Sequence, residues 1–163
     1  ISKNLLKKGY LTDEEVIKYP GVKSMKGIHP VIECSQNIPC NPCQDACPKK
    51  CIKIGAKITS LPVVDEKSEC IGCGMCVASC SGQSIFLVNE DYEEESTSIT
   101  LPYEFLPLPE KGMRGIGLDR SGKEVCEAEV VDVKSLPAFD HTNLLTIKVP
   151  KEMGMKVRFF KQA

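Results

Sequence analysis

The sequence predicts an α+β fold in which a cysteine-rich segment is followed by a β-rich module. Two observations support this prediction. Eight of the ten cysteines lie between Cys40 and Cys80, with Cys34 just before them, and their spacing repeats along the chain. After residue 98, apolar and β-branched residues gather in short runs separated by turn-forming residues, which is typical of strands. A chain of 163 residues suits one ordinary domain or two small ones.

The regions that flank the cysteines show ordinary signals of secondary structure. Near the N-terminus, Thr12 and Glu15 form a capping box, which predicts a short helix over residues 13–19 that ends at a Pro-Gly pair. In the C-terminal part, the segment from Asp119 to Gly122 predicts a hairpin turn. The strands expected there are residues 116–118, 125–133, 145–149 and 157–160.

The segment 89–98 holds five acidic residues and is interpreted as a solvated linker between the two parts. We therefore expect four consecutive regions. They are an N-terminal extension over residues 1–33, a cysteine-rich domain over 34–88, the acidic linker over 89–98 and a β-rich docking module over 99–163.

Composition excludes several classes of protein. The formal net charge of -1 argues against nucleic acid as the main partner. No apolar run is long enough to span a bilayer, and the N-terminal segment lacks the apolar region of a signal peptide. We therefore expect a cytoplasmic location, where disulfides are rare. Ten cysteines in such a chain indicate ligation of a metal or a cluster.

The cysteine-rich segment contains an internal repeat with an offset of 33 residues. Each copy runs from cysteines into a short apolar segment, over residues 52–54 in the first copy and 85–88 in the second. The residues of the first copy are Cys40, Cys43, Cys47 and Cys51, and they recur as Cys73, Cys76, Cys80 and Ser84. Cys34 breaks the offset, because it precedes Cys40 by six residues whereas Cys70 precedes Cys73 by three.

The second copy reads Cys70-x2-Cys73-x2-Cys76-x3-Cys80, which is the spacing of ligands to a [4Fe–4S] cluster. Three thiolates at this spacing converge on three iron corners of one cubane. Glycines 72 and 74 allow the tight loop, because glycine tolerates positive φ, and backbone N–H groups in such a loop can point at the sulfurs. A single zinc ion does not need cysteines packed so densely, so structural zinc is the weaker alternative.

Both copies resemble the motifs of two-cluster bacterial ferredoxins. The first copy reads Cys34-x5-Cys40-x2-Cys43-x3-Cys47-Pro48, with an insertion after its first cysteine. The resemblance implies crosswise ligation, in which the fourth cysteine of each motif serves the other cluster. The first cluster then takes Cys34, Cys40, Cys43 and Cys80, and the second takes Cys70, Cys73, Cys76 and Cys47.

Three further residues bear on this assignment. If Cys34 cannot reach across its longer loop, the first cluster would have three protein ligands and would be a three-iron cluster. Cys51 aligns with Ser84, where ferredoxins place a small residue, and is interpreted as a small buried side chain. Cys126 lies in an expected strand far from the motifs and is interpreted as a core residue.

The whole chain also resembles the small iron–sulfur subunits of multi-subunit bacterial flavin dehydrogenases. The resemblance rests on Cys34, on the segment 38–43 and on the segment 61–65 that leads to Cys70. It implies an electron-transfer subunit without a catalytic site of its own. FAD or FMN would be bound by larger partner subunits that oxidise amino acids such as proline, hydroxyproline or opines, often in anaerobes. A freestanding ferredoxin with an appended β module is the main alternative, and a zinc-binding interaction protein is the weaker one.

Overall fold

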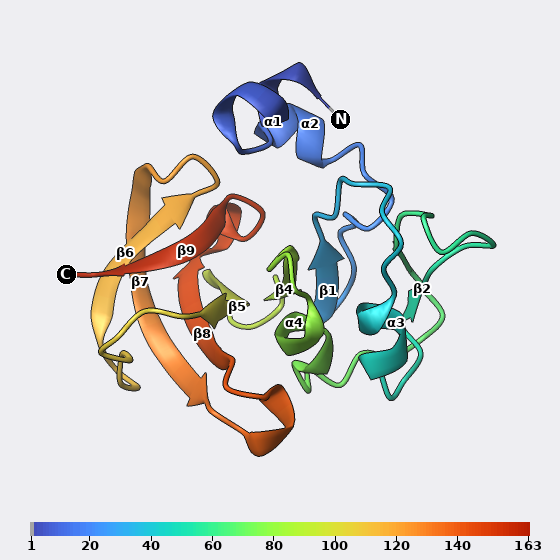
Figure 1. Ribbon diagram of the computed structural model, residues 1–163. Coiled ribbons are helices and arrows are strands. Elements are labelled where there is room, and N and C mark those ends of the chain that lie inside the picture. The colour runs from blue at the N-terminus through green and yellow to red at the C-terminus, as the bar shows by residue number, and fades with distance from the viewer. Residues whose placement is uncertain (1) are drawn as a thin grey trace.

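The protein is described from a computed structural model, which places residues 2–163 (Figure 1). The α-helices are α1 (Lys3–Lys8), α2 (Asp13–Val16), α3 (Pro42–Ala46) and α4 (Met75–Ser79), and the 3-10 helices are η1 (Pro137–Phe139) and η2 (Lys151–Met153). The strands are β1 (His29–Ile32), β2 (Ile52–Lys53), β3 (Val63–Val64), β4 (Ile85–Asn89), β5 (Ser96–Tyr103), β6 (Arg114–Asp119), β7 (Glu124–Lys134), β8 (Asn143–Pro150) and β9 (Val157–Gln162). The fold is therefore mixed α and β, as expected for the α+β class.

A seven-stranded antiparallel sheet runs through the whole molecule in the order β1-β4-β5-β8-β7-β6-β9. Its C-terminal strands curl round on themselves at one side of the molecule (Figure 1). The rings of Tyr103 in β5 and Phe159 in β9 stack with their centroids 5.4 Å apart. The side-chain amide of Gln162 also donates to the Tyr103 hydroxyl over 3.3 Å. The last strand thus returns to the fifth, and β5 to β9 form a partly closed barrel.

The short strands around the cysteines pair crosswise. Strand β1 precedes the first cysteine motif and pairs with β4, which follows the second motif. Strand β2 follows the first motif and pairs with β3, which precedes the second. Helices α3 and α4, one from each motif, contact each other between these pairs. The two copies of the repeat are thus interleaved rather than placed one after the other.

Strand β4 separates two hydrophobic cores. Side chains alternate between the faces of a strand, so Phe86 and Val88 join the core of the barrel whereas Ile85 and Leu87 join the core that contains the cysteines. Both faces are buried, which explains why β4 begins with four consecutive apolar residues instead of an alternating pattern. Leu144, from the C-terminal region, also lies in the cysteine-containing core.

A buried ion cluster ties the N-terminal region to the C-terminal strands. Nε of Arg158 donates to the carboxylate of Glu33 over 2.7 Å, and Nε of Arg120 donates to it over 2.9 Å. The side chains of Glu33, Arg120 and Arg158 are only 9%, 8% and 4% exposed. Arg120 also reaches Asp13 of α2 over 3.1 Å. The carboxylate of Glu33 thus pairs with two arginines, and Glu33 immediately precedes Cys34.

The expected strands of the C-terminal region are confirmed as β6, β7, β8 and β9, and the hairpin turn is confirmed by the positive φ of Gly122. The N-terminal helix begins after the expected Thr12 cap but ends at Val16 instead of residue 19.

The acidic segment 89–98 differs from a free linker. Its acidic residues 91 and 93–95 are exposed, but they lie in the turn between β4 and β5, which pair directly. Strands β1, β3 and β5 were not expected.

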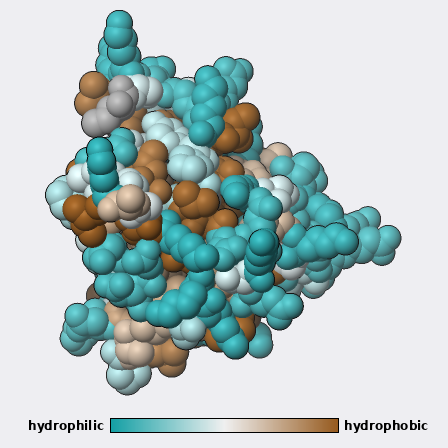
Figure 2. Space-filling model, turned by 90° about the vertical axis from the view of Figure 1, so that its right-hand side faces the viewer, coloured by the Kyte–Doolittle hydropathy of each residue, from teal (hydrophilic) through white to brown (hydrophobic). Residues whose placement is uncertain are grey.

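On the face drawn in Figure 2, hydrophobic residues stand in separate areas among hydrophilic ones. Among residues 2–163, no helix is long and apolar enough to cross a membrane.

Candidate functional site

The two cysteine motifs adopt nearly the same backbone. Helices α3 and α4 each end at the fourth cysteine of their motif, with φ and ψ of -78° and 110° at Cys47 and of -76° and 108° at Cys80. Three residues later, Lys50 and Gln83 both have positive φ, and their N–H groups donate back to the carbonyls of Cys47 and Cys80. The repeat seen in the sequence is therefore a repeat of local structure.

The glycines of the second motif have the conformation expected from its tight loop. Gly72 and Gly74 have φ of 70° and 82°. A Cβ atom on Gly74 would lie 2.4 Å from a methyl group of Leu144, and one on Gly72 would lie 2.7 Å from a methyl group of Ile28. Glycine is thus required here both by the backbone conformation and by the close packing of neighbouring side chains.

Four of the expected ligands surround one cavity, which we call site one. Cys34, Cys40 and Cys43 come from the first motif, and Cys80 comes from the second. The space between the lining atoms, including its opening to solvent, is about 430 Å³. Burial raises the pKa of the Cys34 thiol, and the nearby Cys80 and Cys40 thiols raise it further. Burial and the nearby Cys80 thiol also raise the pKa of Cys43 to about 11.

The other four expected ligands surround a second cavity, site two. Cys70, Cys73 and Cys76 come from the second motif, and Cys47 comes from the first. The space between the lining atoms of site two, including its opening to solvent, is about 320 Å³. Burial raises the pKa of the Cys76 thiol strongly, and the thiols of the other three expected ligands add to this shift. The structure thus gathers the eight cysteines into the two crosswise sets that the resemblance implies.

The lining of both cavities suits an anionic group bound through sulfur. Apart from the cysteines, site one is lined largely by apolar side chains such as Ile32, Ile54 and Ile85, and no carboxylate lines it. Site two has one cationic side chain, Lys49, and no carboxylate in its lining. An oxidised [4Fe–4S] cluster with four thiolates carries a charge of about -2, so these linings fit it. Cysteines must lose their protons to bind metal, and the bound cations would supply the compensating charge.

Several N–H groups already point at the cysteine sulfurs. The backbone N–H of Cys51 donates to Sγ of Cys47 over 3.2 Å, and that of Gly72 donates to Sγ of Cys70 over 3.4 Å. The N–H of Ser84 donates to Sγ of Cys80 over 3.5 Å. Such bonds stabilise negative charge on a ligating thiolate. The expectation that the loop N–H groups point at sulfur is met for these three ligands.

Among the residues that the structure describes, no three His, Cys, Asp or Glu side chains are placed to hold a metal ion. Four thiolates around one tetrahedral zinc, each about 2.3 Å from it, lie about 3.8 Å apart, and the corners of a cubane cluster hold their thiolates further from one another.

Cys51 is closer to a candidate site than its interpretation as a buried small residue implies. It is only 2% exposed, and it lines site two together with the four expected ligands. Burial raises its pKa to about 12, and the charge of the nearby Cys47 raises it as well. The alignment of Cys51 with Ser84 in the repeat was the signal that pointed to this position. Cys126, by contrast, lies in β7 opposite Gly117 and lines neither site.

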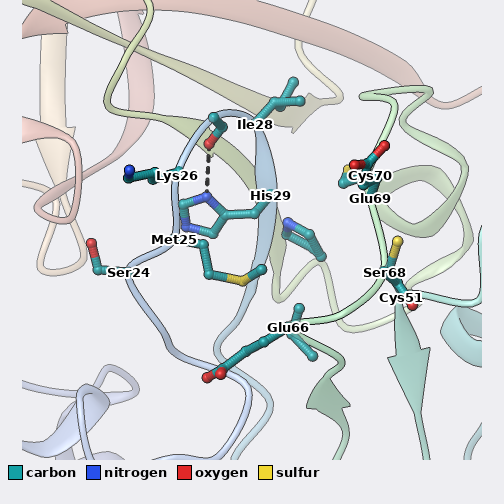
Figure 3. A pocket seen from close by; sticks show the side chains of 13 residues that line it. Ser24, Met25, Lys26, Ile28, His29, Cys51, Glu66, Ser68, Glu69 and Cys70 are labelled. Carbon is teal, nitrogen blue, oxygen red and sulfur yellow. Dashed lines mark hydrogen bonds between the residues drawn. The ribbon is translucent and has the colours of Figure 1, made fainter.

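A wider cleft opens beside site two, with about 1180 Å³ of space including open solvent. Figure 3 shows Cys51 and Cys70 on one of its walls and Met25 and His29 on the other. His29 is 1% exposed, and its ring nitrogens lie 3.0 Å and 3.1 Å from the carbonyl oxygens of Gly27 and Lys23. Both nitrogens thus face backbone carbonyl oxygens, and a neutral ring donates to one of them.

Three comparisons with known proteins complete the description of the site. No family model, no curated protein and no solved structure matches the chain. The functional interpretation therefore depends on the two sets of thiols, their linings and the hydrogen bonds to their sulfurs.

Proposed function

We propose that the chain binds two [4Fe–4S] clusters and passes single electrons through them. The observation that carries this proposal is the crosswise collection of thiols, with three from one motif and the fourth from the other around each cavity. The interleaved strand pairs β1–β4 and β2–β3 support it, because they bring the two motifs together in a manner that ferredoxin-like ligation requires. Neither lining contains a carboxylate, which also supports it. The N–H groups that point at the cysteine sulfurs support it as well.

A bound cluster of this kind accepts and releases one electron at a time. The chain's own residues position it and stabilise its charge. The turns after α3 and α4 set the positions of the fourth cysteines, Cys47 and Cys80, and the N–H groups that follow stabilise their thiolates. Because α3 and α4 contact each other, the two sites adjoin, and an electron would be relayed between them.

We further propose that the relay serves a larger flavin-containing dehydrogenase of the amino-acid-oxidising type, in the cytoplasm. Exposed apolar side chains beside the sites support a partner of this kind. Ile38, which is 48% exposed, lines site one, and Ile71, which is 58% exposed, lines site two. Large apolar side chains next to an electron-transfer site favour docking, since burying them on a partner stabilises the contact. The β-rich barrel adds further surface for docking.

Anaerobic purification of the full chain tests the cluster assignment. We expect a brown protein with about eight iron atoms per chain and electron paramagnetic resonance signals after reduction with dithionite. Cys76→Ser should lose iron, whereas the matched variant Cys126→Ser should retain all of it, because Cys126 lines neither site. A colourless protein without iron would overturn the proposal and favour the zinc alternative.

Native purification tests the assignment to a larger complex. In an anaerobic extract, we expect the chain to elute with larger subunits that contain FAD or FMN. Oxidation of proline, hydroxyproline or an opine by that complex should reduce the clusters. If the chain elutes alone and exchanges electrons with several unrelated enzymes, the freestanding ferredoxin with an appended β module is the better description.

A further inference from the structure

Positions 51 and 84 are equivalent in the repeat, and both lie against the fourth cysteine of their motif. Each follows that cysteine by four residues, after a turn of the same backbone conformation. The N–H of Cys51 donates to Sγ of Cys47 over 3.2 Å, and the N–H of Ser84 donates to Sγ of Cys80 over 3.5 Å. The backbone thus offers one hydrogen bond of the same kind to a ligand of each site.

The side chains at these two positions differ in chemistry. Oγ of Ser84 lies 3.4 Å from Sγ of Cys80. When Cys80 is a ligating thiolate it has no proton to donate, so the Ser84 hydroxyl must be the donor. The side chain at position 51 is a thiol, and the S–H of a thiol is only a weak donor. Site one therefore receives an O–H bond from Ser84, whereas the equivalent side chain beside site two offers only a weak S–H donor.

A hydrogen bond to a ligating thiolate stabilises the cluster more after it gains an electron, because the reduced state carries more negative charge. A stronger donor raises the reduction potential more. We propose that Ser84 and Cys51 are a matched pair of tuning residues, and that the Ser84 hydroxyl raises the reduction potential of site one by more than the Cys51 thiol raises that of site two. This inference rests on the proposed function, since it presupposes two bound clusters.

Neighbouring groups do not cancel the difference between the two positions. Site two also has Lys49 in its lining and a hydrogen bond from the N–H of Gly72 to Cys70. These groups add to the potential of site two whichever residue occupies position 51. Exchanging the side chains at 51 and 84 leaves them in place, so the effect of the exchange isolates the contribution of the two side chains.

The test is a redox titration of the full chain with two bound clusters, followed by electron paramagnetic resonance. Ser84→Ala should lower the potential of one reduction step by about 40 to 59 mV, which is a fivefold to tenfold fall in its equilibrium constant. Cys51→Ser should raise the potential of the other step by about 20 to 40 mV, a twofold to fivefold increase. Ser84→Cys, which keeps a side chain of similar size, should lower the first step by less than Ser84→Ala does.

Iron content separates failure of this inference from failure of the proposed function. If the unmodified chain binds no iron, the proposed function fails. If the variants hold full iron and neither step moves, the tuning role is refuted. It is also refuted if Ser84→Ala and Cys51→Ser shift the same step, because the two positions contact ligands of different sites. Should Ser84→Ala fail to bind iron, Ser84→Cys and Cys51→Ser still decide the question.

Discussion

Replacing Glu33 by glutamine should destabilise the protein strongly, because it removes the one carboxylate that two buried arginines share. The substitution keeps the size and shape of the side chain. Arg158 and Arg120, only 4% and 8% exposed, would then keep their charges without this partner. Removing one partner of a buried ion pair costs about 3 to 5 kcal/mol. The free energy of unfolding of a domain of this kind is about 5 to 15 kcal/mol, so the loss is a large part of its stability.

Urea denaturation followed by circular dichroism measures this loss on the full chain. Asp13→Asn is the matched control, because Asp13 contacts the same Arg120 but is 60% exposed. Exposed ion pairs contribute at most about 1 kcal/mol, so the control should change the free energy of unfolding by less than that. If Glu33→Gln also changes it by less than about 1 kcal/mol, the assignment of the ion cluster as a main link between the N-terminal region and the barrel is refuted.

The same carboxylate predicts a pH dependence. Burial alone would raise the pKa of Glu33, but the charges and hydrogen bonds of Arg158 and Arg120 outweigh it, so the pKa is lowered from its usual 4.5. A lowered pKa in the folded state means that this stabilisation is fully present above about pH 4.5 and is lost as the pH falls through the folded value. The difference in stability between the unmodified chain and Glu33→Gln should therefore shrink below pH 4.5.

Two further pairs of variants test the set of ligands and the loop of the second motif. Cys73→Ser should lose about half of the iron whereas Cys51→Ser should keep all of it, as measured by metal analysis, and equal loss would contradict the set of ligands. Gly74→Ala should lower the free energy of unfolding by about 1 to 3 kcal/mol, because φ is 82° and the new Cβ would lie 2.4 Å from a leucine methyl group. Gly122→Ala is its control, with φ of 85° and no atom within 4 Å, and it should cost about 1 kcal/mol in the same denaturation assay.

Much of the C-terminal fold was accessible from the sequence, because strands β6 to β9 carry β-branched runs and clear turn residues. Strand β5 was missed because its residues, Ser96–Tyr103, follow an acidic segment and include several hydroxyl side chains and a proline. What makes it a strand is its pairing along its whole length with β8, about 50 residues later in the chain. Strand β1 is similar, since its four residues contain a proline and are held by pairing with β4. Local propensity does not encode such partners.

The grouping of the cysteines around two cavities could be predicted from the sequence, and their role as cluster ligands stays a prediction. Cysteine spacing is a steric constraint that acts within one loop, so it can be recognised from sequence alone. The position of Cys51 against Cys47 was missed because it depends on the turn at Lys50 and on burial of the whole segment. The loop after Cys34 is longer than its counterpart in the second motif, and the structure places Cys34 around the same cavity as Cys40, Cys43 and Cys80.

The continuity of the sheet has a consequence for function. Strand β4 leaves the second motif directly after Ser84, and its alternate residues enter two different cores. Leu144, next to β5 in the C-terminal sheet, packs against Gly74 in the second motif. The barrel therefore helps to form the wall behind site two, in addition to offering the surface that we propose for docking. Under the proposed function, a partner that displaces Leu144 would therefore alter the packing around Gly74 in the lining of site two.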